Sequence, residues 1–85
     1  MNQNIPLQAQ ISILSEMLAD AQLSPSQRAK LMFERGKLHW RLGERSEAMS
    51  DYAAAKDLDP SSPAAVALEQ ANDIASFFNP DIYNP

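Results

Sequence analysis

The chain has 85 residues, of which 45% are hydrophobic and 21% are charged, with two glycines and no cysteine. A chain of this length forms one small domain that buries only about 60–65% of its unfolded surface, so we expect modest stability. The lack of cysteine excludes a disulfide scaffold, and the frequent alanines favour closely packed helices.

Eleven acidic and seven basic residues give a formal net charge of −4. No stretch clusters lysine and arginine as phosphate binding requires, so nucleic acid is not an expected partner. A run of about 18 apolar residues is missing, and the first ten residues lack the basic start of a signal peptide. We therefore expect no membrane span and a cytoplasmic location, although a mature secreted chain would have the same features.

The first predicted helix covers residues 7–22. A broad apolar stripe on one face indicates a helix that another element must cover. The stripe consists of Leu7, Ile11, Leu14, Leu18 and Ala21, and it is widened by Ile13 and Met17.

The second predicted helix covers residues 25–42. Ser24 provides a hydroxyl N-cap, Pro25 takes the first helical position, and Gln27 stands three residues after the cap. This combination is typical of a helix start. Gly43 directly follows Leu42 and is the predicted helix stop.

Two further helices are predicted, at residues 46–58 and 63–78. Ser46 is the expected cap of the third helix, and the run from Ser61 to Pro63 repeats the capping device before the fourth. The apolar face of the fourth helix carries Ala64, Ala67, Leu68, Ala71, Ile74, Ala75 and Phe78.

The tail, residues 79–85, holds two prolines and cannot continue a helix. We expect Ile82 and Tyr83 to fold back and cover the last helical face. The alternative is that the tail is a docking peptide for another protein.

Residues 29–62 read AKLMFERGKLHWRLGERSEAMSDYAAAKDLDPSS. This segment resembles a tetratricopeptide repeat, whose period is about 34 residues. The resemblance implies an all-α, four-helix antiparallel array, with residues 7–22 as the second helix of an incomplete repeat and residues 63–78 as the closing helix. The positions that carry the pattern are Gly36, His39, Gly43, Ala48, Tyr52, Ala55 and Pro60.

The spacing also has a direct physical reading. Gly36, Ala48 and Ala55 remove side-chain bulk where two antiparallel helices cross. A glycine inside a helix costs about 1 kcal/mol and needs a packing reason. Arg35 and Asp51 occupy positions that a common variant of the repeat joins by an ion pair, so we expect a structural pair between them rather than a ligand site.

The sequence contains no recognisable catalytic motif. It has no cysteine, no glycine-rich phosphate loop and no set of acidic residues and histidine at metal-ligand spacing. The single histidine, His39, falls on the core side of its helix, and we expect it to be packed and hydrogen-bonded rather than to act as a base. We therefore expect no enzyme, no cofactor and no metal.

One outward face of the second helix is the candidate binding site. Its members repeat at helical spacing and are Lys30, Phe33, Glu34, Lys37, Trp40 and Arg41. The resemblance places this face on the concave groove where ligands of the family lie, and aromatic residues beside bases suit a peptide or protein partner. The alternative is that the first and fourth helices cover Phe33 and Trp40.

The predicted function is therefore a non-enzymatic protein-binding module, or scaffold. The alternative is a structural unit that forms a homo-oligomer because its open repeat faces stack on other copies.

Overall fold

The chain folds into four α-helices joined by short turns, in a computed structural model that describes the backbone of residues 5–77 and the side chains of residues 5–71. The helices are α1 (Leu7–Leu18), α2 (Pro25–Arg41), α3 (Arg45–Leu58) and α4 (Ala64–Phe77). No strand occurs within the described residues, so the expected all-α class is confirmed. None of these helices is long and apolar enough to cross a membrane.

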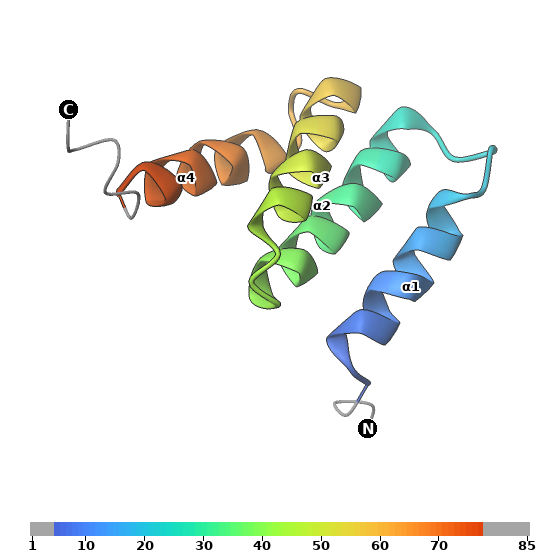
Figure 1. The fold of residues 1–85 in the computed structure, drawn as a ribbon. Coiled ribbons are helices and arrows are strands. Elements are labelled where there is room, and N and C mark those ends of the chain that lie inside the picture. Colours follow the sequence, from blue (N-terminus) through green and yellow to red (C-terminus); the bar gives the residue numbers. More distant parts are fainter. Residues whose placement is uncertain (1–4, 78–85) are drawn as a thin grey trace.

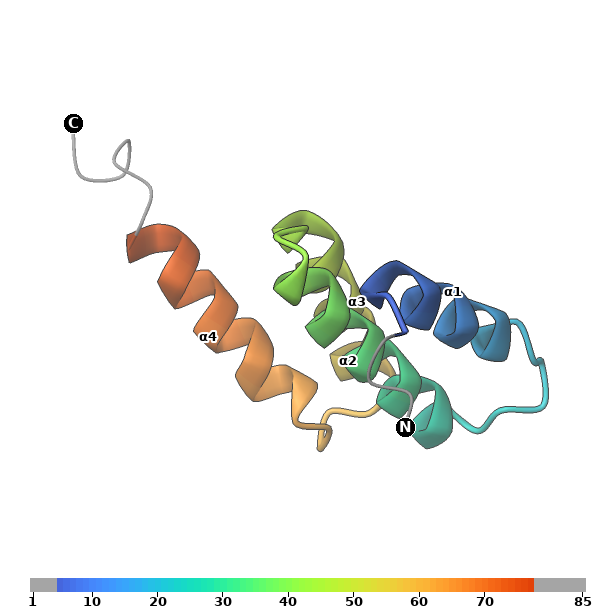
Figure 2. The same ribbon diagram turned by 90° about the horizontal axis from the view of Figure 1, so that it is seen from below.

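Helices α2 and α3 form a central antiparallel hairpin. Helix α1 packs against α2, and α4 packs against α3, so that α1 and α4 lie on opposite sides of the hairpin (Figures 1 and 2). Helix α4 runs away from the hairpin at an angle (Figure 1). Each of the two outer helices therefore has one main neighbour.

Helix α1 ends at Leu18, so the predicted extension to residue 22 is wrong. The guanidinium group of Arg28, on α2, donates hydrogen bonds to the carbonyl oxygens of Leu18 and Asp20, at 2.7 and 2.9 Å. The Asp20 carboxylate then accepts a bond from the backbone N–H of Gln22, at 2.9 Å, as in an Asx-turn. The carbonyl oxygens at the end of α1 are thus satisfied by a side chain from α2. The spacing of apolar residues in the sequence does not reveal such a contact.

Helix α2 begins at the predicted capping box. The Ser24 hydroxyl accepts from the backbone N–H of Gln27 at 3.1 Å, and the Gln27 side chain accepts from the backbone N–H of Ser24 at 2.9 Å. At the other end Gly43 has a φ of +81°, and the next residue, Glu44, donates its backbone N–H to the His39 carbonyl oxygen. This Schellman arrangement confirms the predicted stop at Gly43.

Helix α3 begins at Arg45, so the prediction that Ser46 caps it is wrong. The Schellman turn already places the Glu44 carbonyl oxygen where it accepts from the backbone N–H of Ala48, at 3.0 Å. The N-cap is thus Glu44, whose side chain makes no cap bond. Helix α4 starts at Ala64, one residue after the predicted Pro63, and its Ala64 N–H donates to the Ser62 hydroxyl at 3.1 Å.

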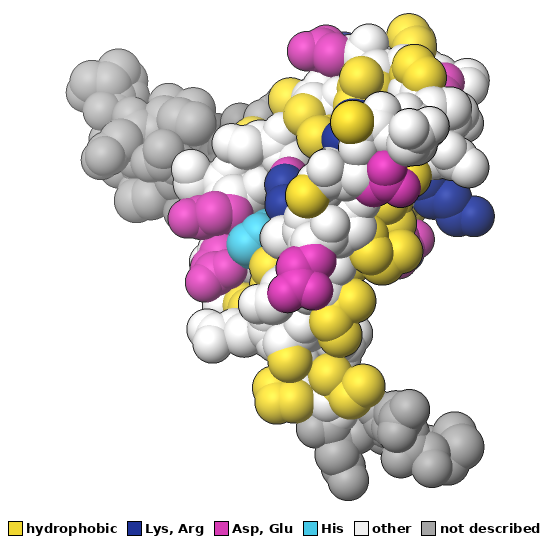
Figure 3. Space-filling view, turned by 90° about the vertical axis from the view of Figure 1, so that its right-hand side faces the viewer, with side chains coloured by type: hydrophobic (Ala, Val, Ile, Leu, Met, Phe, Trp, Pro, Cys, Tyr) yellow, Lys and Arg dark blue, Asp and Glu magenta, His cyan; other side chains and the backbone are white. Residues whose placement is uncertain are grey.

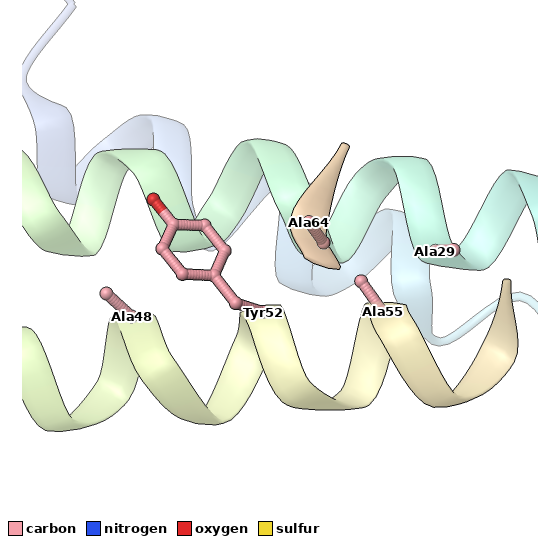
Figure 4. Packing of buried hydrophobic residues seen from close by; sticks show 5 residues of the cluster. All are labelled: Ala29, Ala48, Tyr52, Ala55 and Ala64. Carbon is pink, nitrogen blue, oxygen red and sulfur yellow. The ribbon is translucent and has the colours of Figure 1, made fainter. Parts of the chain in front are cut away.

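The core is made of alanines around a single tyrosine. Its buried members are Ala29, Ala48, Tyr52, Ala55 and Ala64, drawn in Figure 4. No large side chain is completely buried within the described residues, and α1 contributes no buried residue. Because alanines bury little surface, the helices must approach closely for the core to stabilise the fold.

Gly36 provides that close approach, as its place in the sequence predicts. A Cβ atom built there would lie 2.7 and 2.9 Å from two ring carbons of Tyr52, and 3.2 Å from Cβ of Asp51. Only a glycine therefore lets α3 come this near to α2.

We expect Gly36→Ala to lower the free energy of unfolding by about 1 kcal/mol. Overpacking against the Tyr52 ring typically costs about 1–3 kcal/mol, which outweighs the gain of about 1 kcal/mol in helix propensity. Thermal unfolding followed by circular dichroism measures the change, and Ser50→Ala on the exposed side of α3 is the control. A melting temperature equal to or above that of the wild type would contradict the steric argument.

Candidate binding groove

A hollow of about 280 Å³ lies between α2 and α4, with α3 as its floor. We call it the α2–α4 groove. Its lining residues are Phe33, Lys37 and Trp40 from α2, Tyr52 from α3, and Ala67, Gln70 and Ala71 from α4. The α4 side is built from two alanines and a glutamine, and the short alanine side chains leave the space between the helices unfilled.

The aromatic rings of the groove are fixed by the core on one side. Phe33 lies 5.8 Å from the Tyr52 ring, centroid to centroid, at an interplanar angle of 43°. Phe33 and Trp40 both pack against the core cluster and are half-buried. They are therefore neither fully covered nor fully exposed, and one side of each lines the groove.

Two basic groups lie over these rings. The Lys37 Nζ atom is 4.8 Å from the Phe33 centroid, and the Arg45 guanidinium carbon is 5.2 Å from the Trp40 centroid. Such cation–π contacts contribute about 0.5–1 kcal/mol each at exposed sites. Lys37 is also 3.2 Å from a carboxylate oxygen of Glu34. Lys37 and Arg45 thus bring positive charge next to the apolar ring faces, and Glu34 offsets part of the charge of Lys37.

The structure does not bring the six predicted site residues to one hollow. Phe33, Lys37 and Trp40 line the α2–α4 groove, whereas Lys30 and Glu34 line a second hollow, beside the turn between α3 and α4. Arg41 is exposed and lines neither of these two hollows.

Sequence reasoning missed four groove residues and the base beside Trp40. The sequence pattern predicts a core position for Tyr52, although its ring also reaches the groove, and gives no signal for Arg45. Ala67 and Ala71 were placed on an apolar face, and their small size was the available signal that this face leaves a gap. Gln70 carried no signal.

A partly buried polar network joins α2 and α3. The Arg35 guanidinium donates from Nε and Nη2 to the two carboxylate oxygens of Asp51, at 2.8 and 2.7 Å, and from Nη1 to the Ser15 hydroxyl on α1, at 3.0 Å. The predicted ion pair between Arg35 and Asp51 is confirmed. The hydrogen bond to Asp51 raises the pKa of Arg35 above its ordinary value.

His39 belongs to the same network. Its Nδ1 atom is 2.7 Å from a carboxylate oxygen of Glu44, and its Nε2 atom is 3.8 Å from Asp51. The side chain is 16% exposed, which confirms the expectation of a packed, hydrogen-bonded histidine. Next to Asp51, burial raises the pKa of the Tyr52 hydroxyl, and the charge of Asp51 raises it further. These contacts hold α2 and α3 together. Arg35, Asp51, His39 and Glu44 each have a structural hydrogen-bond partner.

Comparison of the chain with models of protein families, with curated proteins and with solved structures gives no match. The case for a function therefore rests on the residues of the groove and on the repeat-like register of α2 and α3.

We expect Arg35 and Asp51 to be coupled by about 1–3 kcal/mol in a double-mutant cycle of Arg35→Leu and Asp51→Leu. Each single substitution leaves a charge unpaired at a site where the side chains are only 23% and 9% exposed, whereas the double substitution leaves none. Urea unfolding of the four proteins gives the coupling free energy.

The pair Lys37 and Glu34 is the matched control, because its side chains are 48% and 46% exposed. We expect less than about 0.5 kcal/mol there. Strictly additive losses for Arg35 and Asp51 would show that the pair is not a unit.

Proposed function

We propose that this chain is a non-enzymatic interaction module of the tetratricopeptide type, which binds a peptide or protein segment in the α2–α4 groove. The observation that carries the proposal is the half-burial of Phe33 and Trp40, which pack on the core and still line an open hollow. Rings held in this way are ready-made anchors, since little side-chain entropy is lost when a partner contacts them.

The size of the groove sets what it accepts. Its volume of about 280 Å³ lies just below the range of about 300–1,000 Å³ typical of small-molecule pockets. It therefore suits one or two large side chains of a peptide better than a cofactor. Lys37 and Arg45 add positive charge beside these anchors.

The repeat-like register supports the same proposal. Gly36 meets Tyr52 at the helix crossing, and Ala48 and Ala55 are completely buried, as the resemblance to a tetratricopeptide repeat predicts for its small and aromatic positions. In such arrays the first helix of a repeat faces the ligand groove, and we infer the same role for α2.

A random-peptide library displayed on phage tests the proposal. We expect peptides selected on the wild-type chain to bind Trp40→Ala about thirtyfold more weakly, because truncation of a hot-spot aromatic costs about 2 kcal/mol or more. Lys37→Glu should weaken the binding of acidic peptides, with a loss of only about 1 kcal/mol in stability from the contacts of Lys37 with Phe33 and Glu34.

Lys56→Glu on the exposed side of α3 makes the same change of charge away from the groove and is the matched control. Thermal unfolding of each variant separates lost binding from lost structure, which matters for Trp40 because it packs against the core. Selected peptides that bind Trp40→Ala and Lys37→Glu as tightly as the wild type would place the binding surface elsewhere.

Self-association is the second candidate, and a specific observation favours it. Ile13 and Met17 on α1 are 49% and 48% exposed, and Val66 on α4 is 56% exposed. Figure 3, which faces the α1 side of the molecule, shows hydrophobic side chains at the surface there. The two outer helices thus carry apolar groups that a second copy would cover.

Sedimentation velocity from low to high micromolar protein tests this candidate. If the open faces stack, the wild type forms a dimer or larger species, and Ile13→Ser combined with Met17→Ser stays monomeric, because the apolar contact is lost. The control is Ser12→Ala on the exposed side of the same helix. A wild type that remains monomeric over the whole range removes self-association from consideration.

A further inference from the structure

The charge of the molecule is unevenly distributed. Although the chain carries a net charge of −4, α2 has a single acid, Glu34, and five bases. These bases are Arg28, Lys30, Arg35, Lys37 and Arg41.

Two of them are used internally, since Arg28 binds backbone carbonyl oxygens and Arg35 binds Asp51. Of the exposed bases, Lys30 lines the second hollow and Arg41 lines neither hollow, whereas Lys37 and Arg45 lie over the aromatic rings of the α2–α4 groove. Lys37 also contacts Glu34, which offsets part of its charge. An occupant of the α2–α4 groove should therefore combine an acidic group with large apolar side chains.

The chain itself contains such a segment. Residues 81–83 are Asp-Ile-Tyr, directly after Pro80, and no lysine or arginine follows Lys56. These residues lie outside the part of the chain that the structure describes. They include Ile82 and Tyr83, which the sequence predicts to fold back over the last helical face. Their sequence is complementary to the lining of the groove, because it places one acid next to two large apolar groups.

The chain length allows the segment to reach the groove. The groove residues of α4 end at Ala71, and the helix continues to Phe77, which is about 9 Å further along its axis. From Phe77 to Ile82 an extended chain spans about 16 Å, enough to return to Ala71 and pass it. Pro80 cannot continue α4, and the residue before it is driven towards an extended conformation, so the helix has to end before the segment.

We propose that residues 81–83 of this chain bind in the α2–α4 groove of the same molecule, with Ile82 and Tyr83 against Phe33 and Trp40 and with Asp81 near the bases over these rings. The tether supplies an effective concentration on the order of 1 mM, so even a weak contact is well populated. The inference goes beyond the proposed function because the occupant is the chain itself. An external ligand of the groove would have to displace it.

Trp40 is the single tryptophan and reports directly on the groove. We expect Ile82→Ser combined with Tyr83→Ser to raise the acrylamide quenching constant of Trp40 about twofold, because the tethered segment no longer shields the ring. Acrylamide is used because it is neutral, whereas iodide would be attracted by Arg45. Asn84→Ser is the matched tail control and should quench like the wild type.

A synthetic peptide of residues 78–85, added to the Ile82→Ser and Tyr83→Ser chain, should restore the protection of Trp40. The same peptide with Asp81→Lys should bind about three- to fivefold more weakly. Equal quenching of the wild type and the double variant overturns the proposal. Protection of the wild type that grows with protein concentration, together with a dimer in sedimentation, also overturns it, because the segment then enters the groove of another copy.

A second measurement keeps residues 81–83 intact, in case the double variant fails to fold. The chain has no cysteine, so Asn84→Cys carries a single nitroxide spin label. We expect the label to broaden the nuclear magnetic resonance signal of the Trp40 indole N–H and to spare the Ile13 methyl signals on α1. Broadening at Ile13 without broadening at Trp40 refutes the proposal.

The two proposals fail in different ways. If the segment occupies the groove, library peptides bind the Ile82→Ser and Tyr83→Ser chain more tightly than the wild type, because they no longer compete with it. If the wild type and the double variant are quenched equally while the binding of selected peptides still requires Trp40, the tethered segment is rejected. The groove then remains a binding site for external peptides. If the segment protects Trp40 from quenching but the library gives no peptide that binds the groove, only the proposal of an external ligand is rejected.

Discussion

The contact between Gly36 on α2 and the Tyr52 ring on α3 is the constraint on which the other features depend. Because a Cβ atom at Gly36 would lie within 3 Å of that ring, the two helices are closer here than ordinary side chains permit. This approach brings Asp51, the residue before Tyr52, within bidentate reach of Arg35, the residue before Gly36. It also turns the Tyr52 ring towards Phe33, where it forms the floor of the groove. Core packing, ion pairing and groove shape thus follow from one close crossing.

A core built from alanines has a second consequence. Alanine loses no side-chain entropy on folding and permits close packing, but each one buries little apolar surface. Alanines at positions 67 and 71 of α4 leave a gap over Phe33 and Trp40 that longer side chains would fill. The small residues that let the helices pack therefore also keep the aromatic rings accessible. Substitutions that fill the gap are expected to gain stability and to remove the groove together.

Local signals explain which parts of the fold were predictable. The capping box at Ser24, the stop at Gly43 and the close approach at Gly36 each depend on one residue and its immediate geometry, and all three were predicted correctly. The end of α1 was not, because the Arg28 guanidinium binds the last carbonyl oxygens from another helix. Periodicity identified the outward face of α2 but not the gap above it, since a gap depends on the angle at which α4 leaves the hairpin. Only half of the six predicted site residues therefore share the α2–α4 groove.

The distribution of charge restricts how an acidic segment can reach this groove. The chain as a whole repels acidic partners, and at physiological ionic strength this repulsion is screened beyond about 8 Å. Lys37 and Arg45 attract an acid only at short range, where they lie over Phe33 and Trp40. A free acidic peptide gains little electrostatic steering under these conditions. A segment that is tethered to α4 needs no such steering, because the tether supplies an effective concentration on the order of 1 mM. The tether, rather than the bases, therefore favours an occupant from this chain over a free ligand of equal composition.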